Sequence, residues 1–229
     1  MSNNRIINAS VLKWIAIITM LIDHVGLVFF PEYSIIRWIG RISFPLFAFL
    51  ICEGYRHTSN IWKYFLRLGI FAIISEIPYD YCLFNRIIYP YSQNIFFVLL
   101  LGLLVLYLID KEYVVKGKDI TIYCQIAIVI VACVIAYFAG FSYKYVGVLF
   151  IVIMYYIREY FPLFSFAAFI IYLIAYGMVN ALFVLLSLPL IYLYNGEQGV
   201  SSKKLKWLFY IIYPLQFVVI IIIRDYVIA

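Results

Sequence analysis

Ionisable side chains stand inside long apolar stretches near the start of the chain. Four of them carry groups suited to proton transfer and charge stabilisation: Asp23, His24, Arg41 and Glu76. If each stretch is a helix rising about 1.5 Å per residue, His24, Arg41 and Glu76 reach one height, about 20 Å from the inner face. An ionised group at the centre of a membrane helix costs roughly 2.5–3.5 kcal/mol, so each needs a partner or a task. We therefore expect a catalytic polar site in the outer half of a helical bundle. The alternative is a buried ion-pair network that only fixes helix packing.

Asp23 and His24 are adjacent, and adjacent side chains point about 100° apart around a helix. A hydrogen bond from Asp23 to His24 is therefore not expected. We expect Asp23 to pair with Arg41 and Glu76 to orient His24. That arrangement leaves His24 neutral with one free ring nitrogen, which can take a proton near neutral pH.

A group of basic residues follows the second apolar run: Arg56, His57, Lys63 and Arg67. Lys63 and Arg67 are four residues apart and share a helix face. Three lysines expected on the same side of the membrane precede the last apolar run: Lys203, Lys204 and Lys206. A polyanionic ligand would meet a basic mouth here, and we assign its binding to the first four residues. The alternative is that these cations only mark the cytoplasmic flank of the helices.

Other polar side chains in the first three runs, and at the start of the fourth, are assigned to substrate contacts: Glu53, Asp80, Gln93 and Asn94. The later runs carry almost no ionisable residue until their ends. We interpret them as scaffold around the working part.

The composition is that of a membrane protein. Of the 229 residues, 67% are hydrophobic and only 12% are charged, whereas soluble domains are about half apolar and about a quarter charged. The 17 Lys and Arg and 11 Asp and Glu leave a net charge of +6. That charge is spread thinly between apolar runs, which excludes a nucleic-acid partner and leaves the lipid bilayer. The four cysteines show no C-x-x-C spacing, so we expect packing groups and no metal.

Nine apolar runs predict an all-α helical bundle in one domain over residues 1–229, multi-pass in the cell membrane. They cover residues 11–30, 35–53, 62–81, 93–109, 120–139, 145–158, 162–176, 178–194 and 207–225. Asp23 and His24 inside the first run favour a permanent helix over a cleaved signal peptide. The stretch 162–194 is either one tilted span or a tight pair broken within 176–180.

The positive-inside rule favours nine spans, with the N-terminus inside and the C-terminal Ala229 outside. Twelve of the 17 Lys and Arg then face the cytoplasm and five face outward, namely Arg37, Arg41, Arg86, Lys144 and Arg224. Eight spans would reduce this split to 10 against 7.

Several of these segments carry motifs of a known family. They are Leu12-Lys13, Met20–Gly26 (MLIDHVG), Ile39–Phe49 (IGRISFPLFAF), Glu53-Gly54, Ser75–Asp80 (SEIPYD), Tyr194–Glu197 (YNGE), Phe209-Tyr210 and Tyr213–Leu215 (YPL). Across nearly its whole length the chain resembles the TraX family of pilin-acetylating membrane proteins. The Gly-Arg-x-x-Phe-Pro-x-Phe run is specific, because hydrophobicity alone would not select it.

The resemblance implies an integral membrane acetyltransferase that takes acetyl groups from cytoplasmic acetyl-CoA and modifies a peptide or cell-envelope acceptor. Six positions match the family's motifs: Asp23, His24, Arg41, Glu53, Glu76 and Asn94. The chain departs from the family pattern at Gln216, where histidine is common, and at Gln198, where a basic residue is usual. Gln216 can hydrogen-bond but cannot titrate, so a second histidine in the last run plays no part here, and the acceptor can differ from pilin.

Two mechanisms fit these residues. His24 acts as general base, with Asp23 or Glu76 orienting it and Arg41 and Asn94 contacting the oxyanion or the acceptor. Alternatively, His24 accepts the acetyl group and passes it outward. Two other functions remain: a proton-coupled transporter, against which the absence of internal repeats counts, and a noncatalytic membrane assembly or immunity factor.

Overall fold

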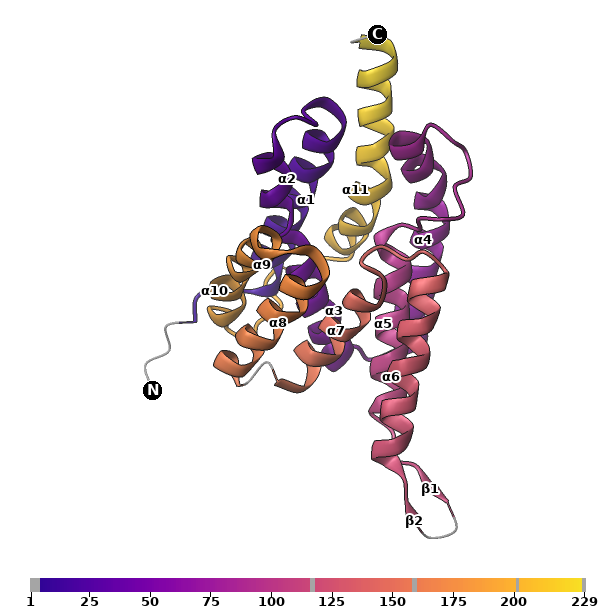
Figure 1. Ribbon diagram of the computed structural model, residues 1–229, viewed down its shortest axis with the longest axis vertical. Helices are drawn as coiled ribbons and strands as arrows, with labels where there is room; N and C mark the ends of the chain where they lie inside the picture. The colour runs from indigo at the N-terminus through magenta and orange to yellow at the C-terminus, as the bar shows by residue number, and fades with distance from the viewer. Residues whose placement is uncertain (1–4, 116–117, 158–159, 201, 228–229) are drawn as a thin grey trace.

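The computed structural model describes residues 5–115, 118–157, 160–200 and 202–227. It is an all-α bundle in which helices cover every predicted apolar run (Figure 1). The helices are α1 (Ala9–Phe29), α2 (Ser34–Gly40), α3 (Ser43–His57), α4 (Ile61–Phe84), α5 (Ile95–Ile109), α6 (Thr121–Phe138), α7 (Lys144–Ile157), α8 (Phe161–Tyr176), α9 (Met178–Leu185), α10 (Ser187–Tyr192) and α11 (Lys203–Ile222). A π-helical turn, Ile223–Val227, extends α11, and the strands β1 (Val114–Val115) and β2 (Lys118–Asp119) pair antiparallel.

By length and composition, four of the described helical stretches can cross a membrane. They are Ala9–Phe29, Ser34–His57, Thr121–Phe138 and Leu205–Val227, and four further apolar helices are shorter. The β1–β2 hairpin and the C-terminus lie at opposite ends of the molecule's long axis (Figure 1). This placement agrees with a hairpin inside and a C-terminus outside, while the span count stays a prediction. Three positions used to predict the orientation, Lys116, Arg158 and Ala229, lie outside the described residues, as do the side chains of Lys203 and Lys204.

Polar residues at the ends of the apolar runs define where several helices begin. The side chains of Asn8, Asn60, Asn94 and Ser202 accept hydrogen bonds from the first turns of α1, α4, α5 and α11. These caps satisfy backbone N–H groups that have no partner within the helix. The stretch 162–194 is broken at Gly177, whose φ of 82° ends α8 before α9 folds back against it. The tight pair is therefore the arrangement that forms, because glycine adopts this left-handed backbone without steric cost.

The first helices approach each other closely through glycine. A Cβ atom on Gly26 would collide with Ile36, and one on Gly40 would collide with Asp23. Small residues allow such close backbone contact between membrane helices. As a result α2 lies directly over the part of α1 that carries Asp23 and His24.

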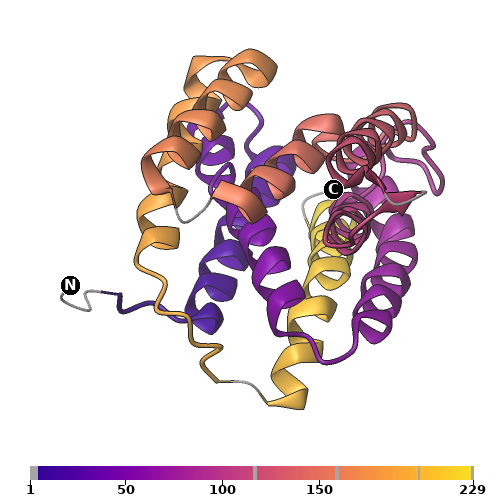
Figure 2. The same cartoon turned by 90° about the horizontal axis from the view of Figure 1, so that it is seen from below.

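The last helix closes the bundle against both α1 and α4. The segment that leads into α11 passes the start of α1 (Figure 2) and is tied to it by backbone hydrogen bonds. Ile7 N–H donates to Leu193 O at 3.0 Å, and Asn195 N–H donates to Ile7 O at 2.8 Å. The segment before α1 and the segment before α11, which are far apart in the sequence, therefore lie side by side.

Candidate active site

His24 opens into a cavity of about 260 Å³. Its walls come from α1, α2, α3, α4, α5, α8 and α11 and from the turn before α7. The polar side chains that line it are Asp23, His24, Arg37, Arg41, Ser43, Tyr79, Ser142, Tyr143, Tyr176 and Tyr213. We call this the outer cavity. It gathers a titratable imidazole, two guanidinium groups and several hydroxyl groups in one space.

Asp23 pairs with Arg37, and the predicted pair with Arg41 is wrong. Arg37 Nε lies 3.1 Å from Asp23 Oδ1. Arg37 is on α2, whereas Arg41 lies just after α2 ends at Gly40. The close approach at Gly40 brings α2 against Asp23, and Arg37, one turn before Arg41, is the arginine that meets the carboxylate.

Arg41 consequently has no carboxylate partner in the described part of the chain. Its Nε is buried without a hydrogen bond. Tyr143 lies next to it on the wall of the outer cavity. A guanidinium without an ion pair in a membrane interior is a ready donor to an anion or a developing negative charge.

His24 makes no hydrogen bond to Asp23 among the described residues, as the 100° offset predicts. Its Nδ1 is buried without a partner. The ring packs against α11, with centroids 4.7 Å from Phe217 and 6.3 Å from Tyr213. The buried side chain of Gln216 lies beside it, close enough to interact with the imidazole. The departure from the family pattern at Gln216 therefore falls next to the proposed catalytic group.

Glu76 does not orient His24, contrary to expectation. Glu76 Oε2 accepts hydrogen bonds from the main chain of Asn94, at 3.2 Å, and from its side-chain amide. The same amide donates to Ala72 O at 2.7 Å, and Asn94 Oδ1 caps α5. Both amide protons of Asn94 are therefore engaged, so it has none left for an oxyanion. Because Asn94 starts α5 directly beside α4, it reaches the carboxylate of Glu76, while rings of α11 surround His24.

Asp80 and Gln93 lie outside both cavities and hold the chain between α4 and α5. Asp80 Oδ2 accepts a hydrogen bond from Tyr89 N–H at 2.6 Å. The side chain of Gln93 donates to Pro90 O at 3.1 Å, and the main-chain carbonyl of Gln93 accepts from the hydroxyl of Ser142 at 2.7 Å. Gln93 thereby positions Ser142 on the wall of the outer cavity, while the predicted substrate contacts of Asp80 and Gln93 stay a prediction.

A second cavity, of about 280 Å³, lies between α1, α3, α4, α5 and α11. Its ionisable and amide side chains are Lys13, Glu53, His57, Arg67, Gln198 and Lys206. The rest of its wall is mostly apolar, with residues such as Leu50, Leu68 and Leu99. We call this the inner cavity. Its cations outnumber its single carboxylate, so it suits a ligand with a polyanionic head and an apolar or extended tail.

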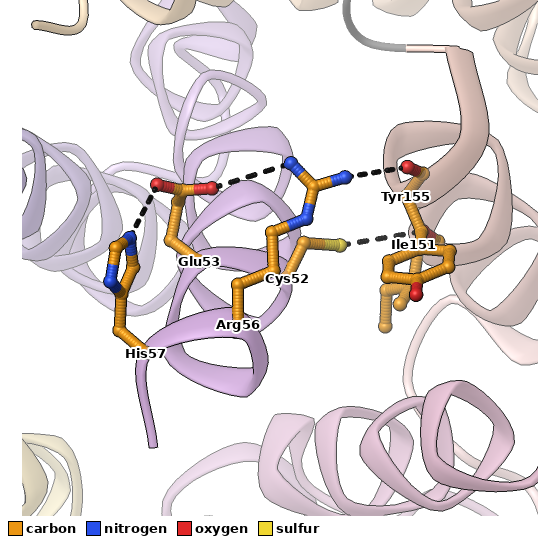
Figure 3. Close-up of polar contacts among 6 residues, drawn as sticks. All are labelled: Cys52, Glu53, Arg56, His57, Ile151 and Tyr155. Carbon is orange, nitrogen blue, oxygen red and sulfur yellow. Dashed lines mark hydrogen bonds and ion pairs between the residues drawn. The ribbon is translucent and has the colours of Figure 1, made fainter. Parts of the chain in front are cut away.

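Glu53 lines the inner cavity, and its carboxylate lies between the side chains of His57 and Arg56 (Figure 3). The nearly buried carboxylate lies 3.7 Å from His57 Nε2 and 3.8 Å from a terminal nitrogen of Arg56. Arg56 also donates to Tyr155 O at 2.9 Å, so its guanidinium turns toward α7. Of the four residues predicted to bind the polyanion, His57 and Arg67 line the cavity, while Arg56 and the exposed Lys63 do not. Glu53 itself lines the inner cavity with the cations, whereas His24 lines the outer cavity.

Four residues line both cavities: Met20, Phe47, Ile95 and Tyr213. They come from α1, α3, α5 and α11, and we call them the shared wall. The two cavities are therefore neighbours, one with a basic mouth and one with His24.

Several residues of these cavities escaped prediction from sequence. Arg37 was counted as an external flanking charge, although its position four residues before Arg41 was a signal that both arginines use one face. Tyr213 carries no local signal, because α11 brings it to the site from the far end of the chain. Lys206 was expected at the basic mouth, whereas Lys13 on α1 was counted only among the cytoplasmic charges.

The comparisons with known proteins agree with the motifs. A family model described as "TraX protein" matches residues 8–224. The chain is 36% identical over 117 residues to a "Probable fimbrial assembly protein FimC, serogroup H1" of Dichelobacter nodosus, a match over 46% of this chain and 48% of that protein. It is 31% identical over 130 residues to an uncharacterised protein of Rickettsia prowazekii, over 57% of this chain and 48% of the relative.

The match covers only about half the length of each of these curated relatives. No solved structure matches the chain. The family model, in contrast, spans almost the whole sequence and includes both cavities. The chain is therefore a membrane protein that belongs to the TraX family.

Proposed function

We propose that this protein is an integral membrane acetyltransferase, multi-pass in the cell membrane, that moves an acetyl group from cytoplasmic acetyl-CoA to an acceptor in the outer half of the membrane. The observation that carries the proposal is the pair of cavities with a shared wall. One cavity suits the donor's phosphates and the other holds an imidazole with an unpartnered nitrogen. A catalyst that joins a cytoplasmic donor to an outer acceptor needs two such adjoining sites.

The donor binds in the inner cavity. Its phosphates lie against Lys13, Arg67 and Lys206, since cationic side chains are the natural partners of phosphate. The pantetheine arm runs along the apolar lining toward the shared wall. The thioester then reaches the wall from the inner side, one helical turn below His24.

His24 performs the proton or acetyl transfer. As a general base it removes the proton from the acceptor's amine or hydroxyl while that atom attacks the thioester carbonyl carbon. The carbon–sulfur bond breaks, and the leaving thiolate of CoA takes the proton back from His24. In the covalent alternative, a ring nitrogen of His24 attacks the carbonyl, CoA leaves, and the acceptor then removes the acetyl group from the imidazole.

Arg41 stabilises the negative charge that develops on the carbonyl oxygen. Among the described residues it has no carboxylate partner, and its buried Nε makes no hydrogen bond, so this N–H can donate to the oxyanion. Arg37 and Asp23 form the neighbouring ion pair and hold α2 against α1. The acceptor is a peptide or other envelope molecule with an amine or hydroxyl, in keeping with the relative named for fimbrial assembly.

The proposal is tested with purified protein in lipid vesicles, using radiolabelled acetyl-CoA and a membrane extract as the source of acceptor. Covalent label on an extract component, identified by mass spectrometry and absent with His24→Ala, is the expected result. Uptake or release of a solute without covalent label would indicate a transporter instead. An extract that gains no label, with a protein that binds the extract component, would indicate a noncatalytic assembly factor.

A further inference from the structure

The shared wall stands between the proposed donor and His24. This inference rests on the proposed function and concerns which acyl group can be transferred. Met20 lies four residues before His24 on α1, and therefore one turn, or about 6 Å, below it. An acyl group that passes Met20 arrives directly at the imidazole.

One side of the wall is held in place. Tyr213 is 4% exposed and its ring packs edge-on to Phe96 at 5.0 Å. The hydroxyl of Tyr213 accepts a hydrogen bond from Ile95 N–H at 3.4 Å, which joins two members of the wall. A ring anchored at both its edge and its hydroxyl does not move aside readily.

The opposite side of the wall can give way only slightly. Met20 is buried at 6% exposure, and its unbranched side chain can change rotamer within a packed core. Phe47 on α3 is half-buried and lines both cavities. An acyl group that moved from one cavity to the other would therefore have to pass the Met20 and Phe47 side chains.

We propose that Met20 and Phe47 select the acyl group by length, so that acetyl passes the shared wall and longer acyl chains do not. The carbonyl carbon must reach His24 while the rest of the acyl group lies between these side chains. A two-carbon group needs space for one methyl group, whereas a butyryl group needs space for two further methylenes in a region that is already packed. Differences of one or two methylenes in an apolar pocket change rates by roughly 10–200-fold.

The test compares radiolabelled acetyl-CoA with butyryl-CoA as donors, using the intact protein in vesicles and the same acceptor extract. Wild-type protein should prefer acetyl-CoA by at least about tenfold in kcat/KM. Phe47→Ala should raise the butyryl-to-acetyl ratio by about tenfold or more, and Met20→Ala should raise it by a smaller factor.

Two matched truncations serve as controls. Phe49→Ala removes the same atoms from α3, but Phe49 packs against Tyr194 at 5.0 Å and lines neither cavity. Ile17→Ala truncates a side chain of α1 about one turn before Met20. The Ile17 side chain lines the inner cavity and not the outer cavity. Both should leave the butyryl-to-acetyl ratio at its wild-type value, and a thermal melt identifies any variant that fails to fold.

The outcomes separate this inference from the proposed function. Acetyl transfer with the same butyryl-to-acetyl ratio in wild type, Phe47→Ala and Met20→Ala overturns the acyl selection and leaves the acetyltransferase standing. A ratio that rises equally in the Phe49→Ala control also overturns it, since general loosening would then explain the effect. A wild-type protein that transfers no acyl group from either donor overturns both.

Discussion

The two cavities are nearly equal in volume, about 280 and 260 Å³, yet their charged side chains are arranged differently. In the inner cavity the cations Lys13, Arg67 and Lys206 stand on a mostly apolar wall, with Glu53 held at the rim by its own neighbours. In the outer cavity the charges are paired or poised around His24. A loose set of cations suits binding of a charged head, whereas a fixed set of donors suits chemistry. Changes in the inner cavity should therefore affect KM, and changes in the outer cavity should affect kcat.

The substitution expected to lower activity the most is His24→Ala, in the outer cavity. Loss of a general base lowers the rate by about 10²–10⁴-fold, and loss of a covalent relay lowers it at least as much. Acetyl transfer in vesicles is measured together with a thermal melt, which should remain close to wild type. Near-normal kcat in a folded variant would eliminate His24 from both mechanisms.

The second prediction concerns the ion pair that fixes α2 on α1. Asp23→Asn should lower the free energy of unfolding by about 1–3 kcal/mol; a fully buried pair would lose more, but Arg37 is 31% exposed. Adding Arg37→Gln should recover part of that loss, because it removes the unpaired partner. The matched control is Asp23→Asn with Arg41→Gln, which should recover nothing. Equal recovery by both double variants would return Arg41 to the role of partner.

The third prediction distinguishes the two arginines near the inner cavity. Arg67→Ala should raise the KM for acetyl-CoA by about tenfold, the value of a charge-assisted hydrogen bond of roughly 1.5 kcal/mol, with kcat little changed. Arg56→Ala is the control, because its guanidinium is turned to Tyr155 and lies off the cavity. A KM that responds to Arg56 and not to Arg67 would place the donor on the α7 side of Glu53.

The smallest effect on activity is expected for single-cysteine substitutions at exposed sites, which report the orientation of the chain in the membrane. Ile88 is 77% exposed between α4 and α5, and Val114 is 62% exposed in β1. In a variant without its four native cysteines, Ile88→Cys should react with a membrane-impermeant maleimide in intact cells. Val114→Cys should react only after permeabilisation. The reverse pattern would invert the membrane orientation and exchange the inner and outer cavities.

The course of the helices could be predicted from sequence more fully than the site. Apolar runs and polar ends mark where helices start and stop, so even the break at Gly177 was among the two expected arrangements. The heights of His24 and Arg41 could be counted along helices. Their partners could not, because pairing depends on how each helix is rotated and on where α2 ends. Gly40 decides that question, and its effect becomes visible only when α1 and α2 are packed together.

Contributions from distant segments were the other part that sequence reasoning missed. Asn94 stood correctly at the start of a helix, but its contact with Glu76 requires the packing of α4 on α5. Tyr213 and Lys206 stand nearly two hundred residues from Met20 and Lys13 along the chain, yet they share cavities with them. No periodic pattern within a helix reports such neighbours.

The hydrogen bonds that tie the segment before α11 to the start of α1 bear on how the protein matures during synthesis. Ala9 N–H donates to Glu197 O at 2.9 Å, and the hydroxyl of Ser10 donates to the carbonyls of Gln198 and Val200 at 3.0 and 2.9 Å. A nascent chain whose last helix is still inside the ribosome lacks Lys206, Tyr213 and Gln216. Its inner cavity has no closed side and its histidine has no aromatic cover. Under the proposed function, activity would therefore begin only when the final helix has been inserted and hydrogen-bonded to the first.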